Sequence, residues 1–354
     1  GDYAVGAVGT ANSYIGIFII MFSIISSGMV SVMTQNIGAG RPGVAYQARQ
    51  LGLLFNAVAG VLMAVFLFSG AGAILRMVGI ADALYEPALI YLKIVGGGCI
   101  LNAVIPIFSS YLRAFGYTKQ PLYATIVGNI ANFVMNAVFL FVLHKGVAGV
   151  AAATVISKIL NLCIVLYFSH KLISAKNSTE RIANKTVLGQ IVKVGLPSAC
   201  ETALYNVAMM LVIRFLNQMD AEGLNVTARS YTATISNFSY CVGAALAQAN
   251  AIVTGWHIGA GELEECDRGT KRAAFVGVCV AVCMETAIVL GSGFIMPLFT
   301  DNPEMTALVR KLLAIDIVLE IGRVTNLVFG QALKTSGDAV FPAVIAAVFM
   351  FVFA

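Results

Sequence analysis

The stretch Asn36-Ile37-Gly38-Ala39-Gly40 decides the fold, because a near copy of it, His257-Ile258-Gly259-Ala260-Gly261, follows 221 residues later. The same offset relates other pairs: Gly70 and Gly291, Gly72 and Gly293, Ile74 and Ile295, Leu112-Arg113 and Leu333-Lys334, Gly116 and Gly337, Pro121 and Pro342. No gap is needed between Val32/Val253 and Pro121/Pro342. The chain therefore contains an internal duplication at the scale of a domain.

The composition is that of a protein embedded in a lipid bilayer. Hydrophobic residues make up 59% of the chain and charged residues 11%, whereas roughly a quarter of the residues in soluble domains are charged. Apolar runs long enough for a transmembrane helix, about 20 residues, recur along the whole sequence. The run 51–74 does not alternate as a strand of a β-barrel would. We therefore expect an all-α polytopic membrane protein.

Ten membrane spans are expected, near 10–34, 50–75, 87–112, 121–143, 147–169, 194–217, 230–256, 272–298, 306–333 and from Ala339 onward. The longest polar stretch, Ser169–Lys193, is basic and marks the boundary between two lobes. We predict an N-terminal lobe at 1–175, a basic cytoplasmic linker at 176–193 and a C-terminal lobe at 194–354. The repeat predicts six helices in each complete lobe. We therefore expect a protein of twelve helices, of which the first is absent from this chain and the last two are cut or absent.

The loops carry an asymmetric charge that predicts orientation. The loops on one side hold thirteen Lys and Arg residues and those on the other side five, and the richer side faces the cytoplasm. Six helices per lobe keep the two copies parallel, an architecture typical of transporters with a substrate site between the halves. We interpret the two Gly-Ala-Gly turns as helix stops in which Gly38 and Gly40 can adopt a positive φ.

Other function classes find little support in the sequence. The net charge of +5 comes mostly from short loops, so it does not indicate a nucleic-acid partner. The seven cysteines have no CxxC or Cys/His spacing and read as small hydrophobic residues. No HExxH, GxSxG or P-loop motif is found. We expect neither an enzyme nor a bound cofactor.

Three charged residues lie near the centre of the span 306–333. Asp316, Glu320 and Arg323 are four and three residues apart, which puts them on one helical face. A charge at the middle of a membrane costs about 2.5–3.5 kcal/mol on insertion scales. Arg323 can neutralise one carboxylate, which leaves one negative charge. We predict a proton or cation site, with a structural ion pair as the alternative.

Two further acids, and several polar residues of the first lobe, are candidate functional-site residues. Glu201 lies inside the span that begins at 194, and Glu285 stands on an otherwise apolar face without a visible partner. In the first lobe the candidates are Asn132, Asn136, Thr154 and Lys158, paired at a spacing of four. Amide and hydroxyl oxygens are ligands for a hard cation such as Na⁺, so Asn132, Asn136 and Thr154 are predicted metal ligands. The alternative is hydrogen bonding between helices. The ammonium group of Lys158 could also take the place of a coupling cation.

Together these residues resemble the multidrug and toxic compound extrusion (MATE) family, from the second to the eleventh of its twelve helices. The matching pieces are Gln35–Gly40, Leu112–Gly116 with Pro121, Asn132 with the residue four later, Gly146–Thr154 and Gly195–Pro197. The resemblance implies two six-helix lobes with a cavity between them, and export of organic, often cationic, compounds in exchange for Na⁺ or H⁺. It also implies cation sites at Asn132 and Thr154.

The resemblance also indicates which lobe carries the coupling site. Asn136 stands where the family often has an aspartate. Because an amide cannot titrate, we expect the coupling site in the second lobe. There the family uses acids on its seventh and tenth helices. Glu201, Asp316 and Glu320 lie on those helices in a different register, and Tyr205 falls nearer the usual acid position of the seventh helix. Tyr205 and Glu285 are the predicted substrate-cavity residues.

We therefore expect a multi-pass protein of the plasma (inner) membrane, working as a monomer. Its expected function is cation-coupled antiport of small organic, cationic, drug-like substrates by alternating access of the two lobes. A lipid-linked oligosaccharide flippase is the first alternative and would predict a cavity rich in Arg and Lys. A transport-inactive receptor or scaffold is the second alternative, and a membrane enzyme is the third.

Overall fold

The chain is helical throughout the part that can be described. The computed structural model describes residues 15–16, 22, 24–77, 82–173, 180–219 and 224–353, and these contain no strand. Residues 24–38 form the first continuous helix. The labelled elements are α2 (Pro42–Met77), α3 (Asp82–Gly97), α4 (Cys99–Ala114), α5 (Lys119–Ala137), η1 (Val138–Val142), α6 (Gly146–Leu172), α7 (Asn184–Met219), α8 (Leu224–Ala260), α9 (Leu263–Ile295), η3 (Met296–Leu298), α10 (Pro303–Ser336), α11 (Val340–Val348) and η4 (Phe349–Phe353).

Each predicted span has a helical counterpart among the described residues. Five helices are long and apolar enough to cross a membrane, and the bent pair 84–97 and 99–114 makes a sixth if it is one span. The helix α10 is equally long but carries Asp316, Glu320 and Arg323. The beginning of the predicted span 10–34 and residues 176–179 of the predicted linker lie outside the described residues.

The linker is shorter than the sequence suggested. The helix α6 continues to Leu172, and α7 already begins at Asn184. The amide of Gln47 on α2 holds this junction, because its Nε2 donates to the carbonyl of Ile182 at 2.7 Å and to Asn184 Oδ1 at 2.5 Å. The second half of the predicted linker is therefore the first part of a helix.

One predicted span is broken in the middle. The helices α3 and α4 meet at Gly98 with a bend of 40°. Close packing explains why glycines occupy this place: a Cβ on Gly96 would lie 2.9 Å from Leu67 Cβ, and a Cβ on Gly98 would lie 3.1 Å from Val155 Cγ2. In the second copy, the equivalent of α3 and α4 is the single helix α10.

The backbone confirms the repeat at both glycine turns. Gly40 has φ 73° and Gly261 has φ 80°, and each closes its helix with the same pair of hydrogen bonds. The amide of Gly40 donates to Ile37 at 3.0 Å, and that of Gly261 to Ile258 at 3.1 Å. Gly40 supplies the left-handed residue, while Gly38 remains helical. The turns at Gly116 (φ 83°) and Gly337 (φ 98°) are a second matched pair. These are helix stops in which glycine avoids the cost of a Cβ.

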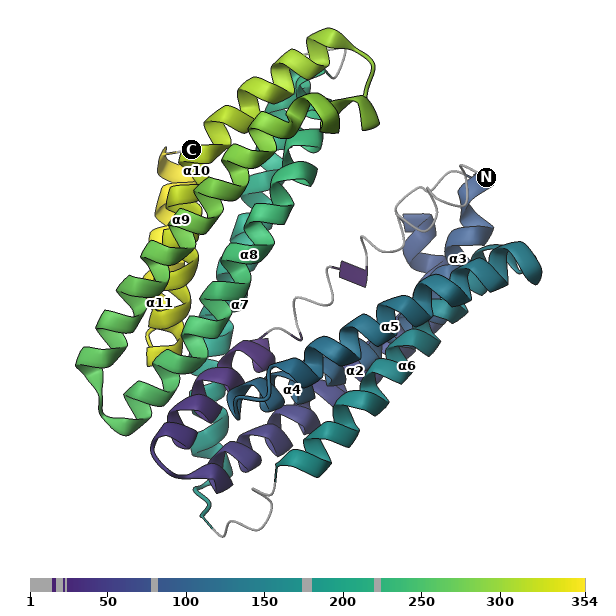
Figure 1. Cartoon of the computed structure of the whole chain (residues 1–354). Helices are drawn as coiled ribbons and strands as arrows, with labels where there is room; N and C mark the ends of the chain where they lie inside the picture. The colour runs from purple at the N-terminus through teal and green to yellow at the C-terminus, as the bar shows by residue number, and fades with distance from the viewer. Residues whose placement is uncertain are drawn as a thin grey trace. The chain divides into compact units, whose positions relative to one another are not determined.

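The chain divides into two compact units, 1–199 (unit 1) and 200–354 (unit 2). In unit 1, α2 packs against α3 and α4, and α6 packs against α3, α4 and α5. In unit 2, the helices α8, α9 and α10 run side by side, and α11 packs on α10 (Figure 1). The helix α7 crosses the division, because Ala199 and Cys200 are consecutive residues within it. The domain boundaries predicted from the linker remain predictions.

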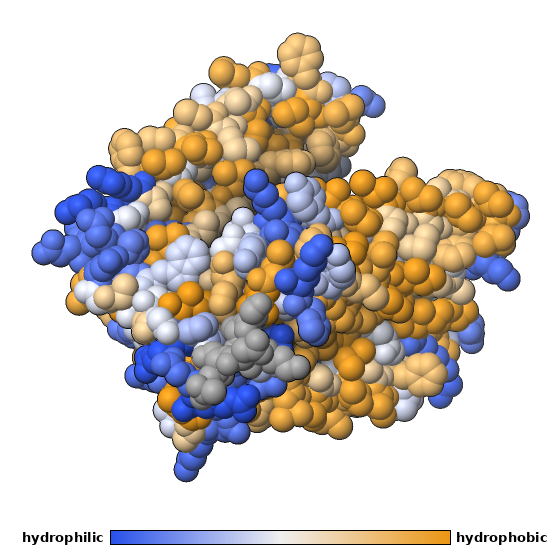
Figure 2. Space-filling view, turned by 60° about the horizontal axis from the view of Figure 1, so that its bottom comes forward, coloured by the Kyte–Doolittle hydropathy of each residue, from blue (hydrophilic) through white to orange (hydrophobic). Residues whose placement is uncertain are grey.

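The exposed surface of the helices is largely apolar. Phe133 is 76% exposed on α5, Phe275 is 72% exposed on α9 and Val318 is 70% exposed on α10. Figure 2 shows hydrophobic residues over the flanks of the helices and hydrophilic residues gathered where the basic junction between α6 and α7 comes forward. Contact of such an apolar surface with lipid tails is favourable, whereas its contact with water is not.

Candidate functional site

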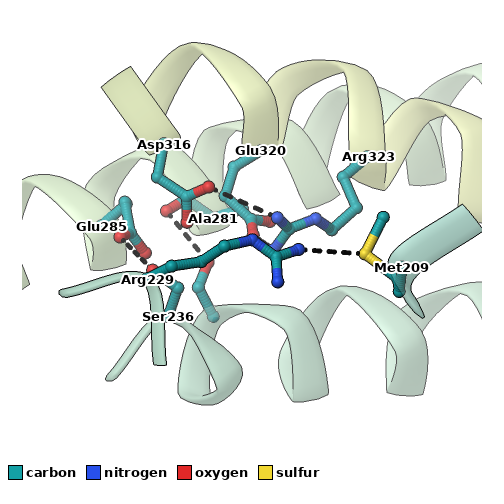
Figure 3. Close-up of polar contacts among 9 residues, drawn as sticks. Met209, Arg229, Ser236, Ala281, Glu285, Asp316, Glu320 and Arg323 are labelled. Carbon is teal, nitrogen blue, oxygen red and sulfur yellow. Dashed lines mark hydrogen bonds and ion pairs between the residues drawn. The ribbon is translucent and has the colours of Figure 1, made fainter. Parts of the chain in front are cut away.

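The three charges of α10 meet as predicted. Arg323 donates through Nη1 to Glu320 Oε1 and through Nη2 to Asp316 Oδ1 at 3.3 Å. Glu320 is fully buried and Asp316 is 8% exposed, while Arg323 is half-buried. Their spacing along one helix brings them together, because residues three, four and seven apart lie on one face. One guanidinium therefore serves two buried carboxylates (Figure 3).

A third carboxylate belongs to the same place. Glu285 of α9 is fully buried, and its Oε1 accepts a hydrogen bond from Ser236 Oγ of α8 at 2.9 Å. Figure 3 shows Glu285 beside Asp316, which shares Arg323 with Glu320. We call Glu285, Asp316, Glu320, Arg323 and Ser236 the acid cluster. Because Glu285 has no exposed surface, it belongs to this cluster rather than to an open cavity wall.

The acid cluster is short of positive charge. Glu285 Oε2, Asp316 Oδ2 and Glu320 Oε2 are all buried without a hydrogen-bond partner among the described residues. Three ionised carboxylates against one guanidinium would leave a net charge of about −2, and burying unpaired charges is costly. Arg229 of α8 donates through Nη2 to Met209 Sδ at 3.1 Å, and among the described residues it forms no ion pair with the three carboxylates. Neutralising the cluster would require protons or other cations.

The fold does not need charges at this place. The repeat relates Glu285, Asp316, Glu320 and Ser236 to Ala64, Val95, Cys99 and Ile15 of unit 1. In unit 1 Ile15, Val95 and Cys99 belong to one hydrophobic core, and Ala64 packs against it. The same arrangement of helices is thus filled by apolar side chains in one unit and by carboxyl groups in the other. Packing alone does not explain the acid cluster.

The other candidate acid of unit 2 has its own partner. Glu201 Oε2 lies 2.8 Å from Lys334 Nζ, and both side chains are mostly buried. Lys334 lies at the end of α10, one turn before the Gly337 stop. The structure therefore does not bring Glu201 to the acid cluster. Tyr205, one turn further along α7, is 49% exposed.

In unit 1 the predicted oxygen ligands form a chain of hydrogen bonds between α5 and α6. Asn136 Nδ2 donates to Asn132 Oδ1 at 3.1 Å, and Asn132 Nδ2 donates to Ser157 Oγ at 3.3 Å. The hydroxyl of Thr154 donates to the carbonyl of Val150 in its own helix at 2.9 Å. Asn136 Oδ1 is buried without a partner. The described residues bring Asn132 and Asn136 together, and Asn136 Oδ1 is the oxygen left available for a cation.

Lys158 turns away from this chain toward another helix. Its Nζ donates to Asn102 Oδ1 of α4 at 2.7 Å, and Asn102 is the residue that the repeat relates to Arg323. The sequence alone did not pair these residues, because they lie 56 positions apart.

Two cations within helices escaped the sequence reasoning. Lys93 is exposed within α3, four residues before its end, and Arg214 is exposed within α7. The interruption of an apolar run by a single basic residue was the available signal. Lys158 and Arg323 are therefore not the only cations on the transmembrane helices.

Two repeated units of apolar helices, with ionisable groups buried inside one of them, are typical of a multi-pass membrane transporter. Comparison with known proteins gives the family. The MatE family model matches residues 1–138 and 197–354. The chain belongs to the MATE family.

Relatives with the same fold cover nearly the whole chain. It is 31% identical over 355 residues to the uncharacterized transporter YisQ of Bacillus subtilis (strain 168), covering 99% of this chain and 78% of that protein. A crystal structure of a MATE protein in the straight conformation superimposes with a TM-score of 0.88 at 20% identity, covering 99% and 79% of the two chains. A transporter of the MOP superfamily from Pyrococcus furiosus Vc1, described as having a binding pocket of reverse polarity, gives 0.82 at 17% identity, covering 99% and 80%. These matches confirm the all-α fold with two lobes.

Proposed function

We propose that this protein exports small organic cations across the plasma membrane in exchange for H⁺ or Na⁺, by alternating access of its two lobes. The acid cluster is the coupling site in this proposal. The single observation that carries it is that two buried carboxylates share one guanidinium, and a third is buried with only a hydroxyl partner, at positions where unit 1 has a hydrophobic core. Membership of a transporter family supports transport as the use for such charges.

Coupling requires that the ion favour one conformation over another. With protons or a cation bound, the cluster is neutral and can stay closed between α8, α9 and α10. Without them, about two negative charges would remain in a buried place, which favours a conformation that admits water or a substrate cation. This difference in charge provides the differential affinity without which ion binding would move nothing. The proton is the favoured ion, because Arg323 already occupies the oxygens that face it.

Unit 1 contributes a fixed cation in this scheme. Lys158, bonded to Asn102, supplies a positive charge beside α5 and α6 that does not depend on an ion gradient. Asn132, Asn136 and Thr154 then act as a polar support, with Na⁺ at Asn136 Oδ1 as the alternative use. Tyr205, exposed on α7, is a candidate for contact with an aromatic or cationic substrate.

The test is transport by the full-length protein in a strain that lacks its main efflux pumps. Ethidium efflux should follow an imposed H⁺ gradient, or an imposed Na⁺ gradient if Na⁺ is the coupling ion. Lack of gradient-dependent efflux across a broad panel of dyes and drugs would contradict the proposal.

The site is tested with neutral isosteres. Asp316→Asn and Glu320→Gln should each reduce gradient-driven efflux by at least about tenfold, since each removes a titrating group and leaves the packing intact. Glu304→Gln is the matched control, because Glu304 is an exposed acid on the first turn of the same helix. Full coupled efflux in both isosteres would show that other carboxylates couple transport.

One observation favours a second candidate, a flippase for lipid-linked oligosaccharides. Lys93, Lys158 and Arg214 add cations on transmembrane helices that could meet a pyrophosphate. In this case reconstituted protein should move a fluorescent lipid pyrophosphate between leaflets, and Lys93→Met should slow that movement without changing ethidium efflux.

A further inference from the structure

The acid cluster contains two kinds of carboxyl group. Asp316 and Glu320 are on one helix and share Arg323. Glu285 is on another helix, and its only hydrogen bond among the described residues comes from the neutral hydroxyl of Ser236. A hydroxyl stabilises an ionised carboxylate far less than a guanidinium does. The two kinds of carboxyl group therefore differ in the partner that stabilises their ionised form: a guanidinium in one case and a hydroxyl in the other.

The surroundings of Glu285 offer no positively charged partner of its own to an ionised carboxylate. The side chain has no exposed surface, and its Oε2 is buried without a partner. The groups that face it are Ser236 from α8 and Asp316, Glu320 and Arg323 from α10. Two of the three charged neighbours are carboxyl groups, and Arg323 is bound to both of them. An additional negative charge at Glu285 would have no partner of its own.

Counting charges gives the number of protons. The pair Asp316 and Glu320 with Arg323 is neutral when it holds one proton, and Glu285 is neutral when it holds another. Unit 1 does not repeat this arrangement, because Ala64 stands at the position equivalent to Glu285. We propose that Glu285 is a second proton-carrying group, so that each transport cycle exchanges two protons, one on the pair bound to Arg323 and one on Glu285.

This inference rests on the proposed function and goes beyond it by giving the stoichiometry and the second carrier. In the outward-open state each site takes one proton from the external medium. In the inward-open state both O–H bonds break, both protons enter the cytoplasm, and the carboxylates ionise while the substrate cation binds. Exchange of two protons for one monovalent cation moves one net positive charge inward, so the membrane potential also drives export.

The experiment measures the substrate gradient that a known proton gradient sustains. Full-length protein is reconstituted into proteoliposomes with the membrane potential held at zero by K⁺ and valinomycin, and ethidium is followed until net flux stops. For one pH unit, coupling to one proton sustains about a tenfold ethidium ratio, and coupling to two protons sustains about 100-fold. We expect about 100-fold for the wild type.

Glu285→Gln separates the two carriers. Its amide oxygen can still accept from Ser236, but the side chain cannot release a proton. We expect transport to continue with a ratio of about tenfold per pH unit and without net charge movement. Glu304→Gln, an exposed acid of unit 2, is the control and should keep the wild-type ratio.

A second readout does not depend on transport. Infrared difference spectra of the wild type, recorded on adding ethidium, should show the C=O band of a buried carboxylic acid disappearing, and Glu285→Gln should lack that component. A wild-type ratio of about tenfold, or an unchanged 100-fold ratio in Glu285→Gln, would overturn the inference and leave the antiporter proposal standing. Ethidium movement that ignores the proton gradient would instead overturn the antiporter proposal.

Discussion

Unit 1 and unit 2 are copies of one arrangement of helices, but their buried polar groups lie at different levels of it. In unit 1 the helices are joined by Asn56, which is 1% exposed and donates to the carbonyls of Phe22 at 3.3 Å and Ala103 at 3.1 Å. The equivalent position in unit 2 is Gly277, where a Cβ would lie 2.8 Å from Leu246 and 2.9 Å from Val324. Unit 2 packs tightly there.

At the level of Asp316 and Glu320, unit 1 has Val95 and Cys99 in a hydrophobic core, and the position of Arg323 is taken by Asn102, to which Lys158 donates a hydrogen bond. Asp316 and Glu320 lie on either side of the residues that correspond to the break between α3 and α4. Unit 1 therefore has a bend between two half-helices where unit 2 has a continuous helix with charges. The amide of Asn56 in unit 1 is neutral and donates to two backbone carbonyls, whereas unit 2 buries three carboxylates and pairs only two of them with a guanidinium. The difference teaches that one arrangement of helices can hold an apolar core in one copy and buried ionisable groups in the other.

The largest expected effect comes from removing the one cation of the acid cluster. Arg323→Leu leaves Asp316 and Glu320 buried without compensation, and we expect the free energy of unfolding to fall by about 3–5 kcal/mol at neutral pH. The loss should shrink in acid, because protonated carboxyls need no cation. Unfolding in detergent at several pH values measures it.

The control is Arg268→Leu. Arg268 pairs with Glu265 on the surface of α9, with both side chains more than half exposed, so its removal should cost no more than about 1 kcal/mol. Equal losses in the free energy of unfolding for Arg323→Leu and Arg268→Leu would mean that Arg323 stabilises the protein no more than an exposed ion pair does.

The second prediction tests whether the acid cluster accounts for the difference between the units, by giving unit 2 the equivalent residues of unit 1. The combined variant Glu285→Ala, Asp316→Val, Glu320→Cys and Arg323→Asn should remain folded, with unfolding unchanged or harder by about 1–4 kcal/mol, since apolar residues replace buried charges. Gradient-driven ethidium efflux should fall at least about 100-fold, a loss of about 2.7 kcal/mol.

Met305→Leu is the matched control for this exchange, because Leu84 is the equivalent residue of unit 1 and both side chains are apolar. It should leave stability and transport nearly unchanged. Coupled efflux by the combined variant would remove the basis for assigning coupling to unit 2.

A smaller effect is expected at the first half of α7, which belongs to unit 1. A Cβ on Gly195 would lie 1.9 Å from the carbonyl oxygen of Ile24, so two backbones meet there. Gly195→Ala should lower the free energy of unfolding by about 1–3 kcal/mol. Gly189→Ala, in the same helix with nothing within 4 Å of the added Cβ, should be neutral or stabilising. An unchanged free energy of unfolding in Gly195→Ala would show that the backbones at Gly195 and Ile24 can move apart without cost.

Much of this comparison could be predicted from the sequence, because the repeat is a matter of spacing. The offset from Gly40 to Gly261 predicted both helix stops, and the spacing of Asp316, Glu320 and Arg323 predicted their shared face. Each of these features depends on residues within one helix or on identical positions in two copies. Local periodicity is sufficient for such features.

The features that the sequence did not predict depend on contacts between distant segments. Glu285 joins the acid cluster across α8, α9 and α10, and the pairing of Lys158 with Asn102 spans two helices. The break at Gly98 follows from close packing against Val155, and the early start of α7 follows from the bonds of Gln47. The periodicity of one helix shows which of its residues share a face. It does not show which residues of another helix will contact that face.

The smallest expected effect tests whether the two copies are still equivalent where no function separates them. Gly40→Ala and Gly261→Ala each force a Cβ into the left-handed region, at φ 73° and 80°, which costs about 1–2 kcal/mol. The two losses should be equal, because the hydrogen bonds that close the turns match within 0.1 Å. The controls are Gly70→Ala and Gly291→Ala, another repeated pair, where the nearest atom to the added Cβ is an isoleucine methyl at 3.8 Å in each copy. Both should be stabilising by about 0.5–1 kcal/mol. Unequal losses at Gly40 and Gly261 would show that the asymmetry of the two units extends beyond the acid cluster to their helix ends.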